Sequence, residues 1–125
     1  MDGKLHILIA DDSDVVRMAL IKTLEDAGHQ VVETTNGQEA LEMACQQSFD
    51  LVITDMKMPK MNGLELIIEL RRLKDYQATP ILGLTNLNTE TILAQLKAAG
   101  ANGWLQKPFG RDGLLNTLHE LDLTG

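Results

Sequence analysis

The chain has 125 residues, a length that suits one domain built around one sheet or bundle. Hydrophobic residues make up 44% and charged residues 23%, which fits a globular protein rather than a disordered one. The net charge of −7 gives no general attraction to nucleic acid or anionic lipid, and the 3% aromatic content argues against base-stacking platforms. No apolar run approaches the roughly 20 residues of a membrane span, and no secretion signal precedes Asp11, so we expect a cytoplasmic protein.

Short apolar runs alternate with longer segments along the whole chain. The runs are continuous rather than alternating in polarity, which is typical of strands covered on both faces. They comprise residues 5–10, 31–32, 51–54, 81–84 and 104–105.

Between the runs, apolar residues recur every three or four positions, as on one face of a helix. The stripes are Val16, Leu20, Leu24 and Ala27; Ala40, Leu41 and Ala44; Leu64, Ile67 and Ile68; Ile92, Leu96 and Ala99; and Leu114, Leu118 and Leu121. Candidate N-caps are Ser13, Asn88 and Thr89, and Gly28 and Gly100 stand where helix-ending glycines belong. Cys45, the only cysteine, excludes an intramolecular disulfide and is expected to be buried in its helix.

Five strands that alternate with five helices predict an α/β fold. The expected architecture is a single doubly wound parallel sheet with helices on both faces, over residues 1–125 as one domain. Parallel strands bring their carboxyl ends to the same edge of a sheet, and open α/β sheets bind ligands at that edge. The side chains that follow the strands are therefore the candidates for a functional site.

Charged and polar side chains follow four of the five runs. They are Asp11 and Asp12 after the first run, Asp55 after the third, Thr85 and Asn86 after the fourth, and Lys107 after the fifth. Three converging carboxylates repel one another unless a cation lies between them, and oxygen ligands suit Mg²⁺. A lysine and a hydroxyl can bind a phosphoryl group, for which a carboxylate can be the nucleophile. Each residue alone is as easily a cap, a strand end or a surface charge, but their joint occurrence predicts a metal and phosphate site.

The order and spacing of these residues resemble those of two-component receiver domains of the single-domain chemotaxis type. The resemblance extends from Lys4 to about Leu121. It rests on Asp11-Asp12, on residues 54–59 (TDMKMP) with Met61-Asn62-Gly63, on Thr85, and on residues 99–109 (AGANGWLQKPF). It implies a flavodoxin-like fold with the strand order 2-1-3-4-5.

The resemblance also implies a phosphorylation-driven switch rather than an enzyme, one that assists its own phosphorylation and dephosphorylation. Asp55 would accept a phosphoryl group from a sensor histidine kinase or a phosphotransfer protein. Mg²⁺ would bind Asp12, Asp55 and the backbone carbonyl of Lys57, and Asp11 would act through water. With no room for an output domain in this length, output is expected through contacts with a downstream protein target.

The resemblance further implies how the signal leaves the site. Lys107 would contact a phosphoryl oxygen, and its bond to Pro108 is expected to be cis. Thr85 would move toward the phosphoryl group, and Trp104 would either swing inward behind it or remain a half-buried strand residue. These movements would bias the face of the fourth helix, fifth strand and fifth helix toward its protein target, without direct nucleic-acid contact or membrane insertion. The positions expected to tune the phosphoryl lifetime are Lys57, Asn86 and Leu87.

Three alternatives stay open. A degenerate receiver would be a constitutive interaction module, although the complete set of acidic residues, threonine and lysine argues against it. A haloacid-dehalogenase-type phosphatase needs a second aspartate two residues after the nucleophile, where Lys57 stands. A flavin binder needs a Ser/Thr/Gly-rich phosphate loop, and residues 11–14 (DDSD) would repel that phosphate. The scattered histidines His6, His29 and His119 are expected to be solvated or to serve packing.

Overall fold

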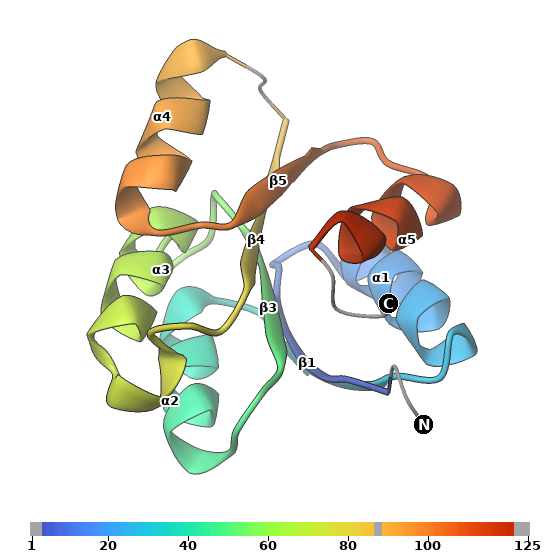
Figure 1. The fold of residues 1–125 in the computed structure, drawn as a ribbon, viewed down its shortest axis with the longest axis horizontal. Helices are drawn as coiled ribbons and strands as arrows, with labels where there is room; N and C mark the ends of the chain where they lie inside the picture. The colour runs from blue at the N-terminus through green and yellow to red at the C-terminus, as the bar shows by residue number, and fades with distance from the viewer. Residues whose placement is uncertain (1–3, 87–88, 122–125) are drawn as a thin grey trace.

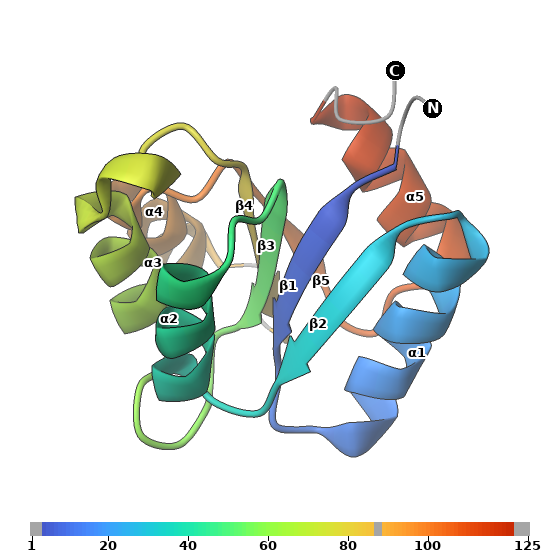
Figure 2. The ribbon, with the colours of Figure 1, turned by 90° about the horizontal axis from the view of Figure 1, so that it is seen from below.

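The computed structural model describes residues 4–86 and 89–121. Five parallel strands form one sheet in the order β2-β1-β3-β4-β5 (Figures 1 and 2). Their bounds are β1 His6–Ala10, β2 Gln30–Thr34, β3 Leu51–Asp55, β4 Ile81–Thr85 and β5 Gly103–Gln106. Each predicted apolar run overlaps one of these strands, so the α/β fold and the expected strand order are confirmed.

Five α-helices alternate with the strands. They are α1 Asp14–Asp26, α2 Gly37–Gln46, α3 Gly63–Arg72, α4 Glu90–Ala99 and α5 Arg111–Glu120, and a short 3-10 helix that the sequence pattern did not predict, η1 Lys74–Tyr76, precedes β4. Helices α1 and α5 cover one face of the sheet, and α2, α3 and α4 cover the other (Figures 1 and 2). Within the described part of the chain, none of the helices combines the length and apolar character that crossing a membrane requires.

Alternate side chains of the strands enter two separate apolar cores, one on each face of the sheet. In β1, Leu8 belongs to the core beneath α2, α3 and α4, whereas Ile7 and Ile9 belong to the core beneath α1 and α5. The helices contribute Leu66, Ile67, Leu70 and Leu96 to the first core and Leu20, Leu24, Leu114 and Leu118 to the second. Each fully buried leucine or isoleucine stabilises the fold by roughly 1.5–3 kcal/mol, so these contacts hold both helical layers on the sheet.

Most of the predicted helix ends are confirmed. The side chains of Ser13 and Thr89 cap α1 and α4, each accepting a hydrogen bond at 3.3 Å from the backbone N–H three residues later. Gly28 and Gly100 follow α1 and α4 with φ values of 97° and 112°, a conformation that favours glycine. The remaining predicted cap, Asn88, lies outside the described residues.

Three details of the prediction are wrong. Ile68 is 46% exposed, because the buried face of α3 consists of Leu66, Ile67 and Leu70. Cys45 is exposed on α2 rather than buried. The edge strands β2 and β5 are only partly buried, because the helices cover the centre of the sheet more fully than its edges.

Candidate functional site

Three carboxylates gather where β1 and β3 end. Asp11 directly follows β1, Asp12 is the next residue, and Asp55 is the last residue of β3. The two strands are parallel neighbours, so their ends lie side by side and bring the acidic residues together. One oxygen from each carboxylate lies within 4.8 Å of the others. Asp11 and Asp55 are buried and Asp12 is exposed, so the cluster reaches solvent at Asp12.

Lys107 places its ammonium group inside this acidic cluster. Its Nζ lies 3.1 Å from Asp55 Oδ1 and 3.4 Å from Asp11 Oδ2, and the side chain is 15% exposed. The backbone N–H of Lys107 donates to the carbonyl oxygen of buried Thr85 at 2.8 Å, and the peptide bond to Pro108 is cis. The structure therefore brings Lys107 and the end of β4 to the acidic cluster. We call this side of the sheet, with Asp11, Asp12, Asp55, Thr85 and Lys107, the carboxyl edge.

The Asp11 carboxylate is incompletely satisfied. Its Oδ1 accepts a hydrogen bond from the Ser13 N–H at 2.8 Å. Its Oδ2, in contrast, is the one buried side-chain polar atom without a hydrogen bond among the described residues. Burial raises the pKa of the Asp11 carboxyl and repulsion by Asp55 adds to this, whereas the Ser13 hydrogen bond and the charge of Lys107 oppose it. Three carboxylates thus face one ammonium group, which leaves the cluster short of positive charge.

These donors fit a divalent cation. Three carboxylates and one ammonium group carry two formal negative charges, which a divalent cation would balance. Within residues 4–86 and 89–121, the buried Oδ2 of Asp11 has only the Lys107 ammonium group, at 3.4 Å, as a partner, so a cation bound directly or through water would add a second one. All the candidate ligands are oxygens and the cluster opens to water at Asp12, a combination that suits Mg²⁺, which usually keeps several waters.

The start of α3 lies so close to the main chain of Asp55 that position 63 requires glycine. Met56 N–H donates to Asp55 Oδ1 at 2.8 Å, and Gly63 N–H donates to the Met56 carbonyl oxygen at 3.1 Å. A Cβ atom on Gly63 would lie 2.1 Å from the Asp55 carbonyl oxygen, which no side chain permits. Asn62 begins α3 with a capping box. The Met-Asn-Gly motif therefore shapes the backbone around Asp55.

Trp104 lies on the outer strand β5, between α4 and α5. Its side of the sheet has a hollow shared with α4 residues such as Leu93 and Lys97, and another shared with α5 residues such as Thr117. Neither hollow includes a residue of the acidic cluster. Trp104 is 44% exposed, so this conformation corresponds to the half-buried strand position.

The residues expected to tune the phosphoryl lifetime lie next to the site in the chain. Lys57 is exposed two residues beyond Asp55, and Asn86 is exposed directly after Thr85. Asn86 also lines a hollow with Lys107, Pro108 and residues of α1. Leu87 lies outside the described residues. The effect of these three positions on lifetime stays a prediction.

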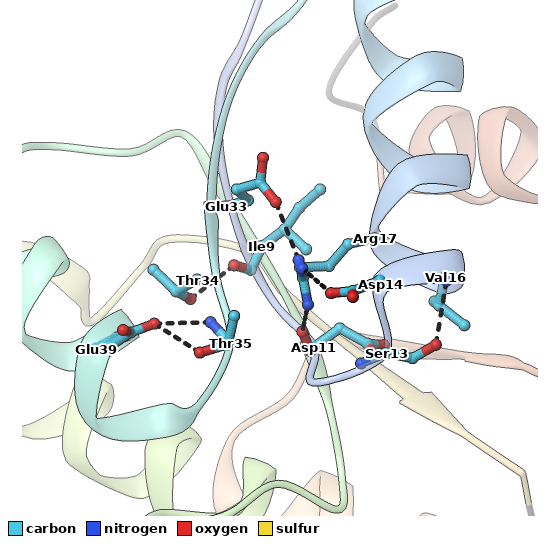
Figure 3. Close-up of polar contacts among 10 residues, drawn as sticks. All are labelled: Ile9, Asp11, Ser13, Asp14, Val16, Arg17, Glu33, Thr34, Thr35 and Glu39. Atoms are coloured by element: carbon cyan, nitrogen blue, oxygen red, sulfur yellow. Dashed lines mark hydrogen bonds and ion pairs between the residues drawn. The ribbon is translucent and has the colours of Figure 1, made fainter.

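Arg17 contacts the site and was missed by the sequence analysis. Its Nη1 donates to the main-chain carbonyl oxygen of Asp11 at 2.8 Å (Figure 3). Arg17 lies on the buried face of α1 together with Leu20 and Leu24. The sequence does carry a signal for this role. Arg17 stands three positions before Leu20 and seven before Leu24, on the apolar stripe of its helix, where a charged side chain needs buried partners.

Comparison with known proteins agrees with this geometry. A family model described as the response regulator receiver domain matches residues 7–119. Among solved structures, the chemotaxis response regulator CheY4 of Vibrio cholerae has a TM-score of 0.91 and 40% identity, over 94% of this chain and 98% of that chain. The CAI-1 autoinducer sensor kinase/phosphatase CqsS of Vibrio cholerae is 37% identical over 112 residues, which is 89% of this chain. The chain spans 16% of the length of CqsS.

A third relative is described with a bound metal ion. The receiver domain of the sensor histidine kinase PA1611 from Pseudomonas aeruginosa, described with a magnesium ion coordinated in its active-site cleft, has a TM-score of 0.87 and 26% identity, over 94% of this chain and 96% of that chain. Receiver domains are phosphoacceptors that partner histidine kinases, and an acidic triad is typical of their Mg²⁺ sites. The family match, together with the acidic pocket of Asp11, Asp12, Asp55 and Lys107, shows that this chain belongs to the response regulator receiver domain family.

Proposed function

We propose that this protein is a switch whose Asp55 accepts a phosphoryl group from a sensor histidine kinase or a phosphotransfer protein. The proposal is supported above all by the Lys107 ammonium group, which lies 3.1 Å from Asp55 Oδ1. The surrounding cluster keeps two formal negative charges, which a divalent cation would balance. A carboxylate beside a fixed cation is equipped to receive a phosphoryl group, because phosphoryl transfer depends mainly on positioning and on charge at the transferred oxygens.

The proposed reaction forms one bond and breaks one bond. A carboxylate oxygen of Asp55 forms a P–O bond with the phosphorus of a phosphohistidine, while the P–N bond breaks and its electron pair returns to the imidazole of the donor. Asp12, Asp55 and the backbone carbonyl of Lys57 would hold Mg²⁺, with Asp11 acting through water. When bound, Mg²⁺ would supply positive charge to the phosphoryl oxygens. Lys107 would pair with a phosphoryl oxygen in place of its present contact with Asp55.

The proposed output is a shift in the face formed by α4, β5 and α5. Thr85, buried at the end of β4, would turn toward a phosphoryl oxygen, and Trp104 would follow it from its half-exposed position on β5. New contacts made only in the phosphorylated form would change the populations of the two arrangements, and with them the affinity for a downstream protein. Lys57, Asn86 and Leu87 would set how long the phosphoryl group survives.

Acetyl phosphate with Mg²⁺, followed by intact-mass spectrometry, tests the acceptor. We expect the wild-type chain to gain the mass of one phosphoryl group and Asp55→Asn to gain none, because an amide is not a nucleophile toward phosphorus. Asp75→Asn, at an exposed aspartate of η1, serves as the matched control and should label like the wild type. A wild-type chain that stays unlabelled under donor excess, or an Asp55→Asn chain that labels normally, would contradict the proposal.

A further inference from the structure

The turn between β1 and α1 carries two of the three acidic residues, and its backbone is held from several directions. The Asp11 N–H donates to the Thr34 carbonyl oxygen at 3.2 Å, which ties the turn to the end of β2. The Asp11 carboxylate accepts from the Ser13 N–H, so the carboxylate and the start of α1 hold each other. The remaining contact is made by Arg17, which reaches the Asp11 carbonyl oxygen from the first full turn of α1.

The Arg17 guanidinium group makes three hydrogen bonds, each to a different segment of the chain. Nη1 donates to the Asp11 carbonyl oxygen at 2.8 Å, Nε donates to Glu33 Oε1 at 3.0 Å, and Nη2 donates to Asp14 Oδ1 (Figure 3). These partners belong to the β1–α1 turn, to β2 and to α1. The Arg17 side chain is 10% exposed, and the hydrogen bond to Glu33 raises its pKa, so the group stays charged.

The contact reaches the main chain of Asp11 and not its carboxylate. The charges that act on the carboxylate are those of Asp55 and Lys107. Arg17 therefore sets where the turn, and with it the Asp11 and Asp12 side chains, stands relative to Asp55. Groups behind metal ligands commonly act this way, and removing one typically weakens metal binding by about 10- to 100-fold.

We propose that Arg17 is the positioning residue of the metal site: it clamps the β1–α1 turn between α1 and β2 and so holds Asp11 and Asp12 in place for a divalent cation. This inference rests on the proposed function, since it assumes that the acidic cluster binds Mg²⁺. In this role Arg17 would act through the Asp11 main chain and would contact neither the metal ion nor the phosphoryl group.

The sign of the effect separates positioning from charge. Removing a positive charge near a cation site strengthens cation binding if charge alone matters. Removing a positioning group weakens cation binding, even though a positive charge is lost. A merely structural role would lower the melting temperature without changing the dissociation constant for Mg²⁺ of the folded protein.

Titration calorimetry with MgCl₂, well below the melting temperature, measures that dissociation constant. We expect Arg17→Gln to raise it about tenfold. Arg17→Lys keeps the charge but cannot make all three hydrogen bonds, so we expect it to raise the dissociation constant severalfold as well. Arg17→Lys also replaces Arg17→Gln in the test if the latter does not fold. The matched control is Arg72→Gln, which removes an exposed arginine paired with Glu69 at the far end of α3 and should leave the constant unchanged within about twofold.

The outcomes are distinguishable from those of the proposed function. If folded Arg17→Gln and Arg17→Lys bind Mg²⁺ as tightly as the wild type, or more tightly, the positioning role is wrong while the phosphoacceptor proposal stands. If the wild-type chain itself shows no Mg²⁺ binding, the magnesium part of the proposed function and this inference both fall. Phosphorylation rates measured against Mg²⁺ concentration give a second readout: Arg17→Lys should shift the half-saturating Mg²⁺ concentration more than the maximal rate.

Discussion

The two ends of the parallel strands differ in how fully their polar groups are hydrogen-bonded. At the carboxyl edge, the buried Oδ2 of Asp11 has no hydrogen bond and three carboxylates share one ammonium group. At the opposite side, which we call the amino edge, the strands begin among groups that satisfy one another. There His29 Nδ1 accepts from the Leu5 N–H at 3.0 Å, and Asp50 Oδ2 accepts from the His6 N–H at 2.9 Å.

Arg71 is the clearest example of this satisfaction at the amino edge. From the end of α3, its guanidinium group donates to the carbonyl oxygens of Gly100, Tyr76 and Thr79 and to Asn102 Oδ1, at 2.6–3.1 Å. Asn102 Oδ1 also accepts from Ile81 N–H, the first residue of β4. One side chain thereby joins α3, η1, the end of α4 and the start of β4.

The amino edge therefore contributes to the stability of the fold, whereas the carboxyl edge reduces it. The Asp11 carboxylate is buried beside Asp55 and Lys107 balances its charge only in part, so its pKa is raised and its charged form lowers the stability of the metal-free protein. A cation and a phosphoryl group are the partners that this edge would gain. The polar groups at the amino edge are already hydrogen-bonded to one another and need no ligand.

The largest expected effect tests the amino edge. Arg71→Met should lower the free energy of unfolding by about 3 kcal/mol, because it leaves several main-chain carbonyl oxygens without a donor. Urea denaturation measures this loss. The neighbouring Arg72→Met, at an exposed arginine, is the control and should cost less than about 0.5 kcal/mol. Equal losses in the two variants would mean that Arg71 does not support this edge.

A smaller effect of opposite sign is expected at the carboxyl edge. Asp11→Asn should raise the free energy of unfolding of the metal-free protein by about 1 kcal/mol, because relief from burial and from repulsion by Asp55 outweighs the lost 3.4 Å ion pair with Lys107, and an oxygen remains for the Ser13 N–H. Urea denaturation in the presence of a chelator measures the gain, with Asp75→Asn as an exposed control. A loss of stability would break the proposed contrast between the edges.

Acidification should reduce the difference in the free energy of unfolding between Asp11→Asn and the wild type. The pKa of Asp11 is raised above 3.8 by burial and by Asp55, so the folded chain takes up this proton before the unfolded chain does. Its contribution to stability therefore grows as the pH falls through the folded pKa toward 3.8. The advantage of Asp11→Asn should shrink over the same range, as urea denaturation at several pH values would show.

The smallest expected effect is a pH dependence of opposite sign at the amino edge. His29 Nδ1 accepts from a backbone N–H, which can only donate, so this nitrogen is unprotonated. Burial lowers the pKa of His29 below 6.5, and the unfolded chain therefore binds this proton first on acidification. The contribution of His29 to stability is present above pH 6.5 and is lost as the pH falls below that value.

His29→Asn isolates this contribution, because Asn Oδ1 can accept the same hydrogen bond without titrating. Between about pH 7 and pH 5, its free energy of unfolding should fall less than that of the wild type, by at most the roughly 1 kcal/mol of one hydrogen bond. Parallel pH profiles of the two proteins would show that His29 makes no pH-dependent contribution.

The carboxyl edge was largely predictable from the sequence, and the amino edge was not. Asp11, Asp55 and Lys107 each directly follow or end a strand, so the parallel topology alone brings them together. The partners of Arg71, in contrast, include Gly100 and Asn102, about thirty positions along the chain, and no local pattern indicates those contacts. His29 and Leu5 are likewise joined only by the way β2 pairs with β1.

Two details of the site itself also needed coordinates. Arg17 stands on the apolar stripe of α1, but its partners Asp11 and Glu33 are set by the turn and by the neighbouring strand. Trp104 lies on an edge strand, where the sequence is compatible with a buried or a half-exposed indole. The structure has the half-exposed one, because the flanking helices α4 and α5 leave hollows beside it.

The acidic cluster is proposed to bind a divalent cation and to lower the stability of the metal-free protein. Both properties are measured together by thermal unfolding of the wild type and Asp11→Asn, each with a chelator and with saturating Mg²⁺. We predict that Asp11→Asn has a higher melting temperature than the wild type with the chelator. Mg²⁺ should raise the melting temperature of the wild type substantially more than that of the variant. If Mg²⁺ raises both melting temperatures equally, or if Asp11→Asn is the less stable protein with the chelator, the account is wrong.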